Sequence, residues 1–158
     1  MEFVIRPMDG AAARRIATWR YESPYDYYNL IGDPLVFVGR EGEAADYFQI
    51  LCNHELVGFC CFGAEGQVPG GDYSAPGLDI GIGIRPDLTG RGQGLHYLAA
   101  VTDFAERTFA PPTLRLTVAD WNTRAIRLYS RAGFVISAEF HSQFSRQLFL
   151  MMHRAVQQ

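Results

Sequence analysis

Apolar and polar residues alternate along several short stretches of the chain, which is typical of β-strands with one buried face. In the clearest stretch, from Leu78 to Arg85, every second residue is Leu or Ile, and the residues between are Asp, Gly, Gly and Arg. The same pattern, with the flanking turn residues, predicts seven strands: Phe3–Arg6, Tyr47–Cys52, Leu56–Phe62, Leu78–Arg85, Leu114–Val118, Phe134–Phe140 and Leu148–His153. The tight turn after Cys52 falls on Asn53-His54 or on His54-Glu55.

A second spacing, of three or four residues, predicts helices. Asp9 is a good N-cap for a helix over 10–20, and Pro24 suits the first turn of a short second helix. A longer helix starts near Gly94 and ends before Pro111, and another spans Asn122–Ala132 and is closed by Gly133. The glycines and prolines of Gly63–Gly77 indicate a loop. The mixture of strands and helices predicts an α/β or α+β fold.

Length and charge limit the function classes. The 158 residues suggest one domain, 1–158, and the hydrophobic fraction of 48% indicates a folded, soluble protein. A net charge of −3 argues against nucleic acid as a partner. No apolar run is long enough to span a membrane, and the first ten residues lack the apolar core of an export signal, so we expect a cytoplasmic protein.

All fourteen basic residues are Arg. The absence of Lys excludes the phosphate-binding loop of nucleotide hydrolases and a pyridoxal-phosphate Schiff base. Cys52, Cys60 and Cys61 are expected to be reduced, packed thiols. His54, Cys52 and Cys60 form only a weak metal-binding pattern, so no metal is expected.

The glycine-rich turn after the strand Leu78–Arg85 carries the strongest chemical signal. Gly90, Gly92 and Gly94 alternate and then open a helix. The free N–H groups and the dipole of a helix start favour an anion, and glycine lets a phosphate reach those groups. The pattern therefore predicts a phosphate or pyrophosphate site. The dinucleotide fingerprint G-x-G-x-x-G does not fit in any frame, which argues against a nicotinamide cofactor.

A second motif runs from Asn122 to Phe134. Asn122 and Tyr129 lie seven residues apart, two turns along the same side of the predicted helix. Taken alone, Asn122 is most simply an N-cap and Tyr129 a core aromatic residue.

These two motifs together resemble the GNAT N-acetyltransferase family. Its Gln/Arg-x-x-Gly-x-Gly/Ala motif corresponds to Thr89-Gly90-Arg91-Gly92-Gln93-Gly94, and its Asn-x-x-Ala-x-x-Leu-Tyr-x-x-x-Gly-Phe motif is complete from Asn122 to Phe134. Thr89 departs from the family pattern, which usually has Gln or Arg at this position. The resemblance implies a mixed, mostly antiparallel sheet of six to seven strands with helices on both faces. A splayed parallel pair of strands would form the cofactor cleft.

The resemblance also implies acetyl-CoA as co-substrate and assigns residues to it. The pantetheine arm would pair with the backbone of Ile82, Gly83 and Ile84, and Asn122 would contact its cysteamine end. Tyr129 would protonate the departing thiolate. The pyrophosphate would bind the N–H groups of Gly90, Arg91, Gly92, Gln93, Gly94 and Leu95.

The acceptor amine must lose a proton before it attacks, which requires a base or a chain of water molecules. Where some relatives carry Glu, this chain has Thr117, which cannot serve. Asp79 and Glu22 are the candidates, and Asp79 is equally well explained as a hydrogen-bonded acid on the strand.

The aromatic and acidic segment Trp19–Tyr28 would either roof a pocket for an amine with an apolar body or pack the first helices onto the sheet. Two further functions stay open beside the enzyme. One is a non-catalytic CoA-binding module. The other is a phosphotransfer protein, which the missing Lys and the missing pair of Asp residues for magnesium disfavour. The acceptor, a small-molecule amine or an amine of a peptide or protein, and the oligomeric state, including a homodimer, are undetermined by sequence.

Overall fold

The computed structural model describes residues 2–29, 34–38 and 46–157. The chain divides into two compact units, each built from two segments. Unit 1 comprises Met1–Cys61 and Ile82–Gln93, and unit 2 comprises Phe62–Gly81 and Gly94–Gln158. The predicted single domain, 1–158, includes residues outside the described ranges, and it stays a prediction.

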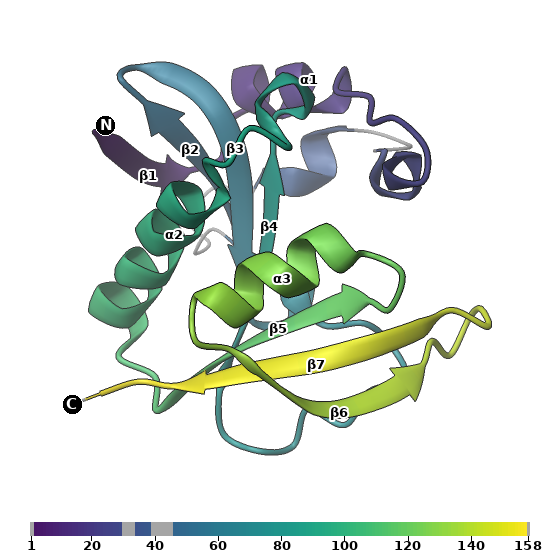
Figure 1. Cartoon of the computed structure of the whole chain (residues 1–158). Helices are drawn as coiled ribbons and strands as arrows, with labels where there is room; N and C mark the ends of the chain where they lie inside the picture. Colours follow the sequence, from purple (N-terminus) through teal and green to yellow (C-terminus); the bar gives the residue numbers. More distant parts are fainter. Residues whose placement is uncertain (1, 30–33, 39–45, 158) are drawn as a thin grey trace. The chain divides into compact units, whose positions relative to one another are not determined.

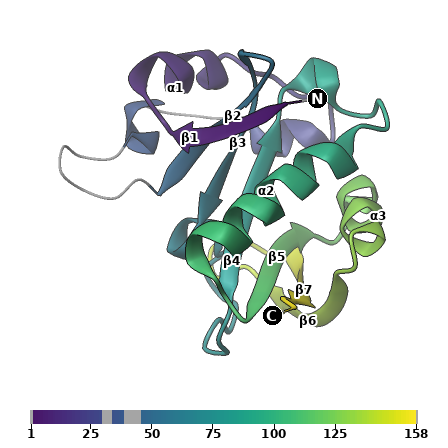
Figure 2. The same ribbon diagram turned by 90° about the vertical axis from the view of Figure 1, so that its left-hand side faces the viewer.

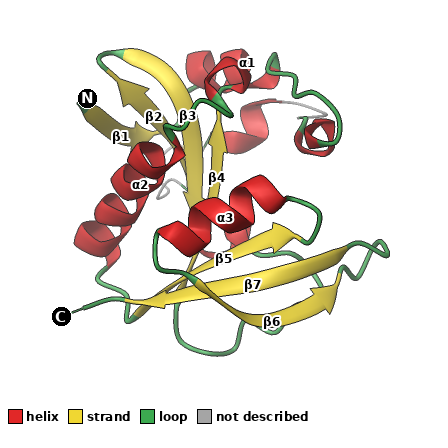
Figure 3. Cartoon of the chain, viewed as in Figure 1, coloured by secondary structure: helices red, strands yellow, loops and turns green. Residues whose placement is uncertain are grey.

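In the part of the chain that the structure describes, seven strands form a mixed sheet, as the sequence predicts, with the order β1-β2-β3-β4-β5-β7-β6. The strands are β1 (Phe3–Pro7), β2 (Tyr47–Cys52), β3 (Glu55–Phe62), β4 (Leu78–Ile84), β5 (Thr113–Ala119), β6 (Val135–His141) and β7 (Leu148–Ala155). The α-helices are α1 (Gly10–Ala17), α2 (Gly94–Phe109) and α3 (Thr123–Arg131). Among the described residues, the 3-10 helices are η1 (Tyr25–Tyr28), η2 (Pro34–Phe37), η3 (Gly63–Gly66) and η4 (Pro86–Leu88). Figure 3 shows these elements by type.

In unit 1, α1 begins where the sequence predicts, because the Asp9 carboxylate accepts a hydrogen bond from the Ala12 N–H at 2.8 Å. Figure 2 shows α1 following directly after β1 along the chain. Its buried residues, among them Ile16, pack into a cluster with Leu51 and Leu56 of the hairpin. The helix ends at Ala17, three residues earlier than predicted. Thr18 ends it, since its hydroxyl donates to the Arg15 carbonyl at 2.6 Å.

The hairpin of β2 and β3 turns at Asn53-His54, which decides between the two predicted positions. Both residues have positive φ, 50° and 70°, which a two-residue type I′ turn requires. This turn sets the pairing of Cys52 with Glu55 and of Leu51 with Leu56.

In unit 2, the first residues of β4 pair in parallel with β5, from Leu78 with Leu114 to Ile80 with Leu116. β5 and β7 then run antiparallel along their whole length, as Figure 1 shows. One face of these strands is apolar and buried, with Ile80, Leu116 and Met152 at 0–2% exposure. At its end, Arg154 of β7 donates to Glu106 of α2 and to the carbonyl after α3, so both helices belong to this face.

The other face of the unit 2 strands is covered by the loop that precedes β4. Gly66 packs against the backbone of Asp79 and Ile80, and a side chain at Gly71 would overlap Met151 and Phe140. The loop carries the short helix η3 in place of the wholly irregular segment that its glycines and prolines predict. Its close packing leaves Arg115 of β5 only 6% exposed.

Candidate active site

The glycine-rich turn lies between η4 and α2, as predicted. Gly90 and Gly92 have φ of 71° and 76°, a left-handed conformation that side chains other than glycine rarely adopt. A Cβ added at Gly92 would have no atom within 4 Å. Within the described residues, no group accepts a hydrogen bond from the N–H of Gly92 or Gln93. The turn therefore presents open backbone donors directly before a helix start, which suits an anion.

The other residues of the turn are positioned for solvent contact. Arg91 and Gln93 are exposed, and Leu95 is 40% exposed. Thr89, the departure from the family pattern, donates its hydroxyl hydrogen to the Pro86 carbonyl at 2.7 Å. Its side chain thus stabilises the η4 turn.

At two glycines that the sequence analysis assigns to a ligand, side chains of the protein itself occupy the space where a Cβ would lie. A Cβ on Gly83 would overlap the ring of Phe59, so the group that approaches this strand is an aromatic side chain. A Cβ on Gly94 would lie 3.0–3.1 Å from the methyl groups of Leu128, so the absence of a side chain lets α2 approach α3. Of Gly83, Gly92 and Gly94, Gly92 is the one with open space at its Cβ position.

The end of β4 supplies Ile82, Gly83 and Ile84, which all belong to unit 1. The Ile84 carbonyl accepts a hydrogen bond from the Tyr21 hydroxyl at 2.7 Å. This contact joins the aromatic segment after α1 to the strand that the resemblance assigns to pantetheine. The sequence carried no signal for it, since the two residues lie 63 positions apart.

Helix α3 positions Asn122 and Tyr129. The Asn122 side chain accepts from the Ala125 N–H at 3.1 Å, so this residue is the predicted N-cap. Tyr129 is 8% exposed, and its ring lies 6.4 Å from the ring of Phe134. Gly133, with φ of 92°, closes the helix as predicted. Both residues therefore have a structural role, and their catalytic roles stay predictions.

Asp79 lies in a buried polar network of unit 2. Arg115 donates from Nε to Asp79 Oδ1 at 2.6 Å and from its terminal nitrogen to Oδ2 at 2.9 Å. Gln67 donates to the same Oδ2 at 2.9 Å. These hydrogen bonds from Arg115 raise the pKa of its guanidinium. The sequence left Asp79 open as a base or as a hydrogen-bonded acid, and the structure shows the hydrogen bonds. The role of Asp79 as a base stays a prediction.

The other candidate base, Glu22, is exposed and belongs to unit 1. Thr117, at the position where some relatives carry Glu, shares a hydrogen bond of 2.9 Å with the Tyr73 hydroxyl.

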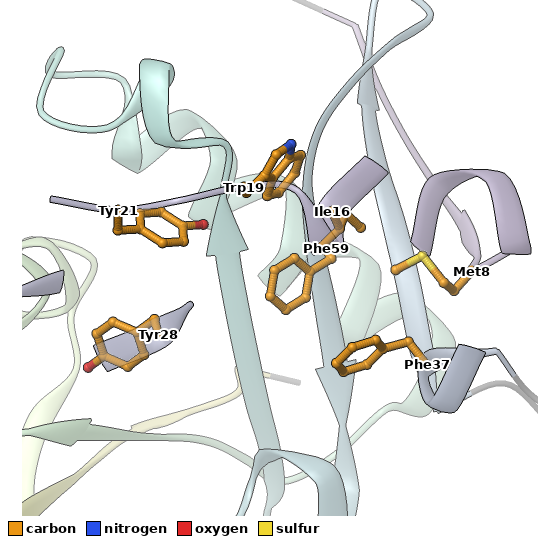
Figure 4. Close-up of a pocket in the computed structure, with 7 residues that line it drawn as sticks. All are labelled: Met8, Ile16, Trp19, Tyr21, Tyr28, Phe37 and Phe59. Carbon is orange, nitrogen blue, oxygen red and sulfur yellow. The ribbon is translucent and has the colours of Figure 1, made fainter. Parts of the chain in front are cut away.

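The aromatic segment after α1 both packs against the core and lines a pocket, and an amine as the pocket's ligand stays a prediction. Trp19 packs against the core cluster of unit 1, and Trp19, Tyr21 and Tyr28 also line a pocket (Figure 4). The sequence pattern did not reveal the pocket's other lining residues, Met8, Ile16, Phe37 and Phe59. The one sign of the Phe59 ring in the sequence is Gly83 of β4, where the missing side chain leaves space for the ring.

Two of the three cysteines are packed in the core as predicted, whereas Cys52 is only partly buried. Cys60 and Cys61 are buried in β3, and none of the three cysteines forms a disulfide. Burial, and to a lesser extent the neighbouring Cys61, raises the pKa of the Cys60 thiol. The described residues contain no cluster of three His, Cys, Asp or Glu that could hold a metal ion. None of the described helices has the length and apolar character needed to cross a membrane.

Comparison with known proteins assigns this fold to a class. The model of the acetyltransferase (GNAT) family matches residues 12–134, which include both motifs. The chain therefore belongs to the GNAT acetyltransferase family and is an enzyme of the acyltransferase class. No curated protein matches the sequence.

Several solved structures share the fold. A GNAT-family acetyltransferase from Bacillus anthracis has a TM-score of 0.75 at 14% identity, with 98% of this chain and 95% of that chain covered. The N-acetyltransferase PseH of Campylobacter jejuni, in complex with acetyl coenzyme A, has a TM-score of 0.70 at 17% identity, covering 99% and 100%. Spermidine N-acetyltransferase from Vibrio cholerae, in complex with CoA and spermine, has a TM-score of 0.64 at 18% identity, covering 97% and 95%.

Proposed function

We propose that this protein transfers the acetyl group of acetyl-CoA to a primary amine. The observation that carries the proposal is the turn at Gly92, where left-handed backbone, open space and unbonded N–H groups precede α2. The family match and the acetyl coenzyme A in the PseH complex support it.

The chain's backbone would hold most of the co-substrate. The N–H groups from Gly90 to Leu95 would bind the pyrophosphate, and a side chain at Gly92 would stand in its way. The backbone of Ile82, Gly83 and Ile84 would pair with the pantetheine arm. Asn122 would contact the cysteamine end while it caps α3.

Acetyl-CoA would supply a thioester carbonyl that an amine can attack. A nitrogen–carbon bond then forms and a carbon–sulfur bond breaks, so the amine loses a proton and the sulfur gains one. Tyr129 would donate its hydroxyl proton to the leaving thiolate, because a phenol of pKa ~10 can share a proton with a thiol of pKa ~8.5.

We propose direct transfer of the acetyl group in a ternary complex, without a covalent intermediate on Cys60. A cysteine nucleophile must be a thiolate, and burial holds the Cys60 thiol protonated. For the amine proton, we propose Glu22 or water as the acceptor. Asp79 is less suited because it would have to release hydrogen bonds from Arg115 and Gln67.

The test measures release of the CoA thiol from acetyl-CoA with a panel of amines that includes peptides with a free N-terminus. Amine-dependent release supports the enzyme. Saturable acetyl-CoA binding without release for any amine would favour the non-catalytic CoA-binding module. A non-catalytic module would be expected to lack Asn122 and Tyr129, yet this chain has both. Sedimentation of the same protein tests the homodimer, which stays a prediction.

A further inference from the structure

Arg85 lies between the end of β4 and the glycine-rich turn, and its side chain bonds to two elements of unit 1. Its Nε donates to Asp87 Oδ1 at 2.7 Å and a terminal nitrogen donates to Oδ2 at 3.2 Å, the paired geometry of a guanidinium on a carboxylate. The other terminal nitrogen donates to the Glu55 carboxylate at 2.8 Å and to the Leu56 carbonyl at 2.9 Å. One side chain therefore links η4 to the start of β3.

This link differs from an ordinary surface ion pair. The Arg85 side chain is only 19% exposed, although the Glu55 and Asp87 side chains are 63% and 59% exposed. Exposed ion pairs contribute little to stability because water screens them. A paired carboxylate contact and a backbone carbonyl, in contrast, fix the orientation of the guanidinium plane. The main effect of Arg85 is therefore on geometry: it fixes where η4 lies on β3.

The backbone carries this position on to the glycine-rich turn. The Arg85 N–H donates to the Val57 carbonyl at 2.8 Å, and the Arg85 carbonyl accepts from the Leu88 N–H at 2.9 Å. The Thr89 hydroxyl donates to a carbonyl of η4 at 2.7 Å. Gly90, the next residue, has φ of 71° and begins the turn. A displaced η4 would therefore displace the turn that follows it.

The end of β4 has a separate anchor. The Tyr21 hydroxyl donates to the Ile84 carbonyl at 2.7 Å, and Figure 4 shows the Tyr21 hydroxyl directed at this strand. This contact does not involve the Arg85 side chain. Removal of that side chain should therefore move the turn and leave the strand end in place.

In the proposed function, CoA engages the turn through its pyrophosphate and the end of β4 through its pantetheine arm. Two halves joined in one molecule bind more tightly than either alone only when the protein can engage both at once. We infer that Arg85 is a positioning residue, which sets the turn at the distance from the strand end that CoA requires. It acts through the turn, because protein groups engage most of its N–H donors. The inference rests on the proposed function and adds a residue to it.

Three ligands test the inference by calorimetric titration of the full chain, and none of them needs a known acceptor amine. They are CoA, pantetheine, and adenosine 3′-phosphate 5′-diphosphate, which is the half of CoA that carries the pyrophosphate. We expect Arg85→Gln to raise the Kd for CoA about tenfold and to change the Kd for each half by less than about twofold. A side chain that only stabilises the fold would not separate CoA from its two halves.

Arg154→Gln is the matched control. Arg154 of unit 2 also pairs with one carboxylate, that of Glu106 at 3.1 Å, and donates to one carbonyl, that of Ala132 at 2.8 Å. Its side chain is 27% exposed. Arg154→Gln should lower the melting temperature about as much as Arg85→Gln and leave the Kd for CoA unchanged. An equal loss of CoA affinity in the two variants would overturn the inference.

Asp87→Ala provides a second variant, which keeps the Arg85 side chain and removes only its link to η4. It should raise the Kd for CoA in the same direction as Arg85→Gln. Because the two substitutions remove one shared interaction, their effects on the Kd for CoA should not add in the double variant. Additive effects, or an unchanged Kd in Asp87→Ala, would contradict the positioning role.

The outcomes separate the inference from the proposed function. If the parent protein binds CoA and Arg85→Gln binds it equally well, the inference is wrong and the acetyltransferase stands. The inference is also wrong if Arg85→Gln weakens the nucleotide half as much as it weakens CoA. If the parent protein does not bind CoA, the proposed function fails and the inference fails with it.

Discussion

Tyr129 is the residue on which the proposed proton transfer depends. Its ring is buried beside Phe134, so Tyr129→Phe keeps the packing and removes only the hydroxyl. We expect turnover to fall by ~10²–10⁴, the usual contribution of a positioned acid, with little change in acetyl-CoA affinity. Steady-state kinetics and equilibrium binding measure the two quantities.

Tyr97→Phe is the control for this substitution, because Tyr97 is a buried tyrosine of α2 with no proposed role in chemistry. If Tyr129 only packs, both variants should lose roughly 1 kcal/mol of stability and keep their turnover. That result, with chemistry shown to be rate-limiting, would remove Tyr129 from the mechanism.

Gly92 offers the sharpest test of the anion site. Gly92→Ala places a methyl group in the open space before the N–H groups, and we expect it to weaken acetyl-CoA binding at least tenfold. An alanine at this positive φ costs about 1 kcal/mol of folding stability in addition. Gly63→Ala is the matched control, because Gly63 has φ of 80° and an equally open Cβ position but lies at η3. Equal binding by the two variants would contradict the site.

Three glycines show which contacts of the candidate site could be predicted from the sequence and which could not. Gly83, Gly92 and Gly94 all belong to one motif-bearing stretch, and the pattern alone assigns them to ligand approach. The structure separates them, because Phe59 covers Gly83 and Leu128 lies against Gly94. Such contacts join residues that are distant in sequence, so a one-dimensional pattern does not contain them.

Among the elements, the parallel pair of β4 and β5 depends on a buried ion pair. The pairing of Asp79 with Arg115 follows from the register of the two strands, and neither residue signals the other across 36 positions. Element positions were predictable because apolar periodicity and caps are local properties. The end of α1 was not predictable in the same way, because the Thr18 hydroxyl donates a hydrogen bond to a backbone carbonyl of the last helical turn.

Asp79→Asn should destabilise the fold by about 3 kcal/mol or more, because it leaves the Arg115 charge buried without a carboxylate. Urea unfolding measures this loss, and the double variant Asp79→Leu with Arg115→Met should recover part of it. If Asp79→Asn instead keeps its stability and loses turnover together with the low-pH limb of the rate profile, Asp79 acts as the base.

For the whole molecule, the two units are interleaved along the chain. The chain passes between them after Cys61, after Gly81 and after Gln93, so neither unit is a continuous segment. We therefore expect one cooperative heat-unfolding transition, with equal calorimetric and van't Hoff enthalpies. Two separated transitions would show that the units unfold independently and would contradict the predicted single domain.

Acetyl-CoA should raise the midpoint of that transition. A ligand that binds only the folded state adds ~2.7 kcal/mol at a free concentration of one hundred times its Kd, which corresponds to about 5–10 °C for a chain of this size. Pantetheine, which lacks the pyrophosphate, should give a much smaller shift than free CoA if the turn at Gly92 is the phosphate site, as we propose. Gly92→Ala should remove most of the difference between these two ligands, and Gly63→Ala should preserve it. No shift with millimolar acetyl-CoA would reject acetyl-CoA as the co-substrate.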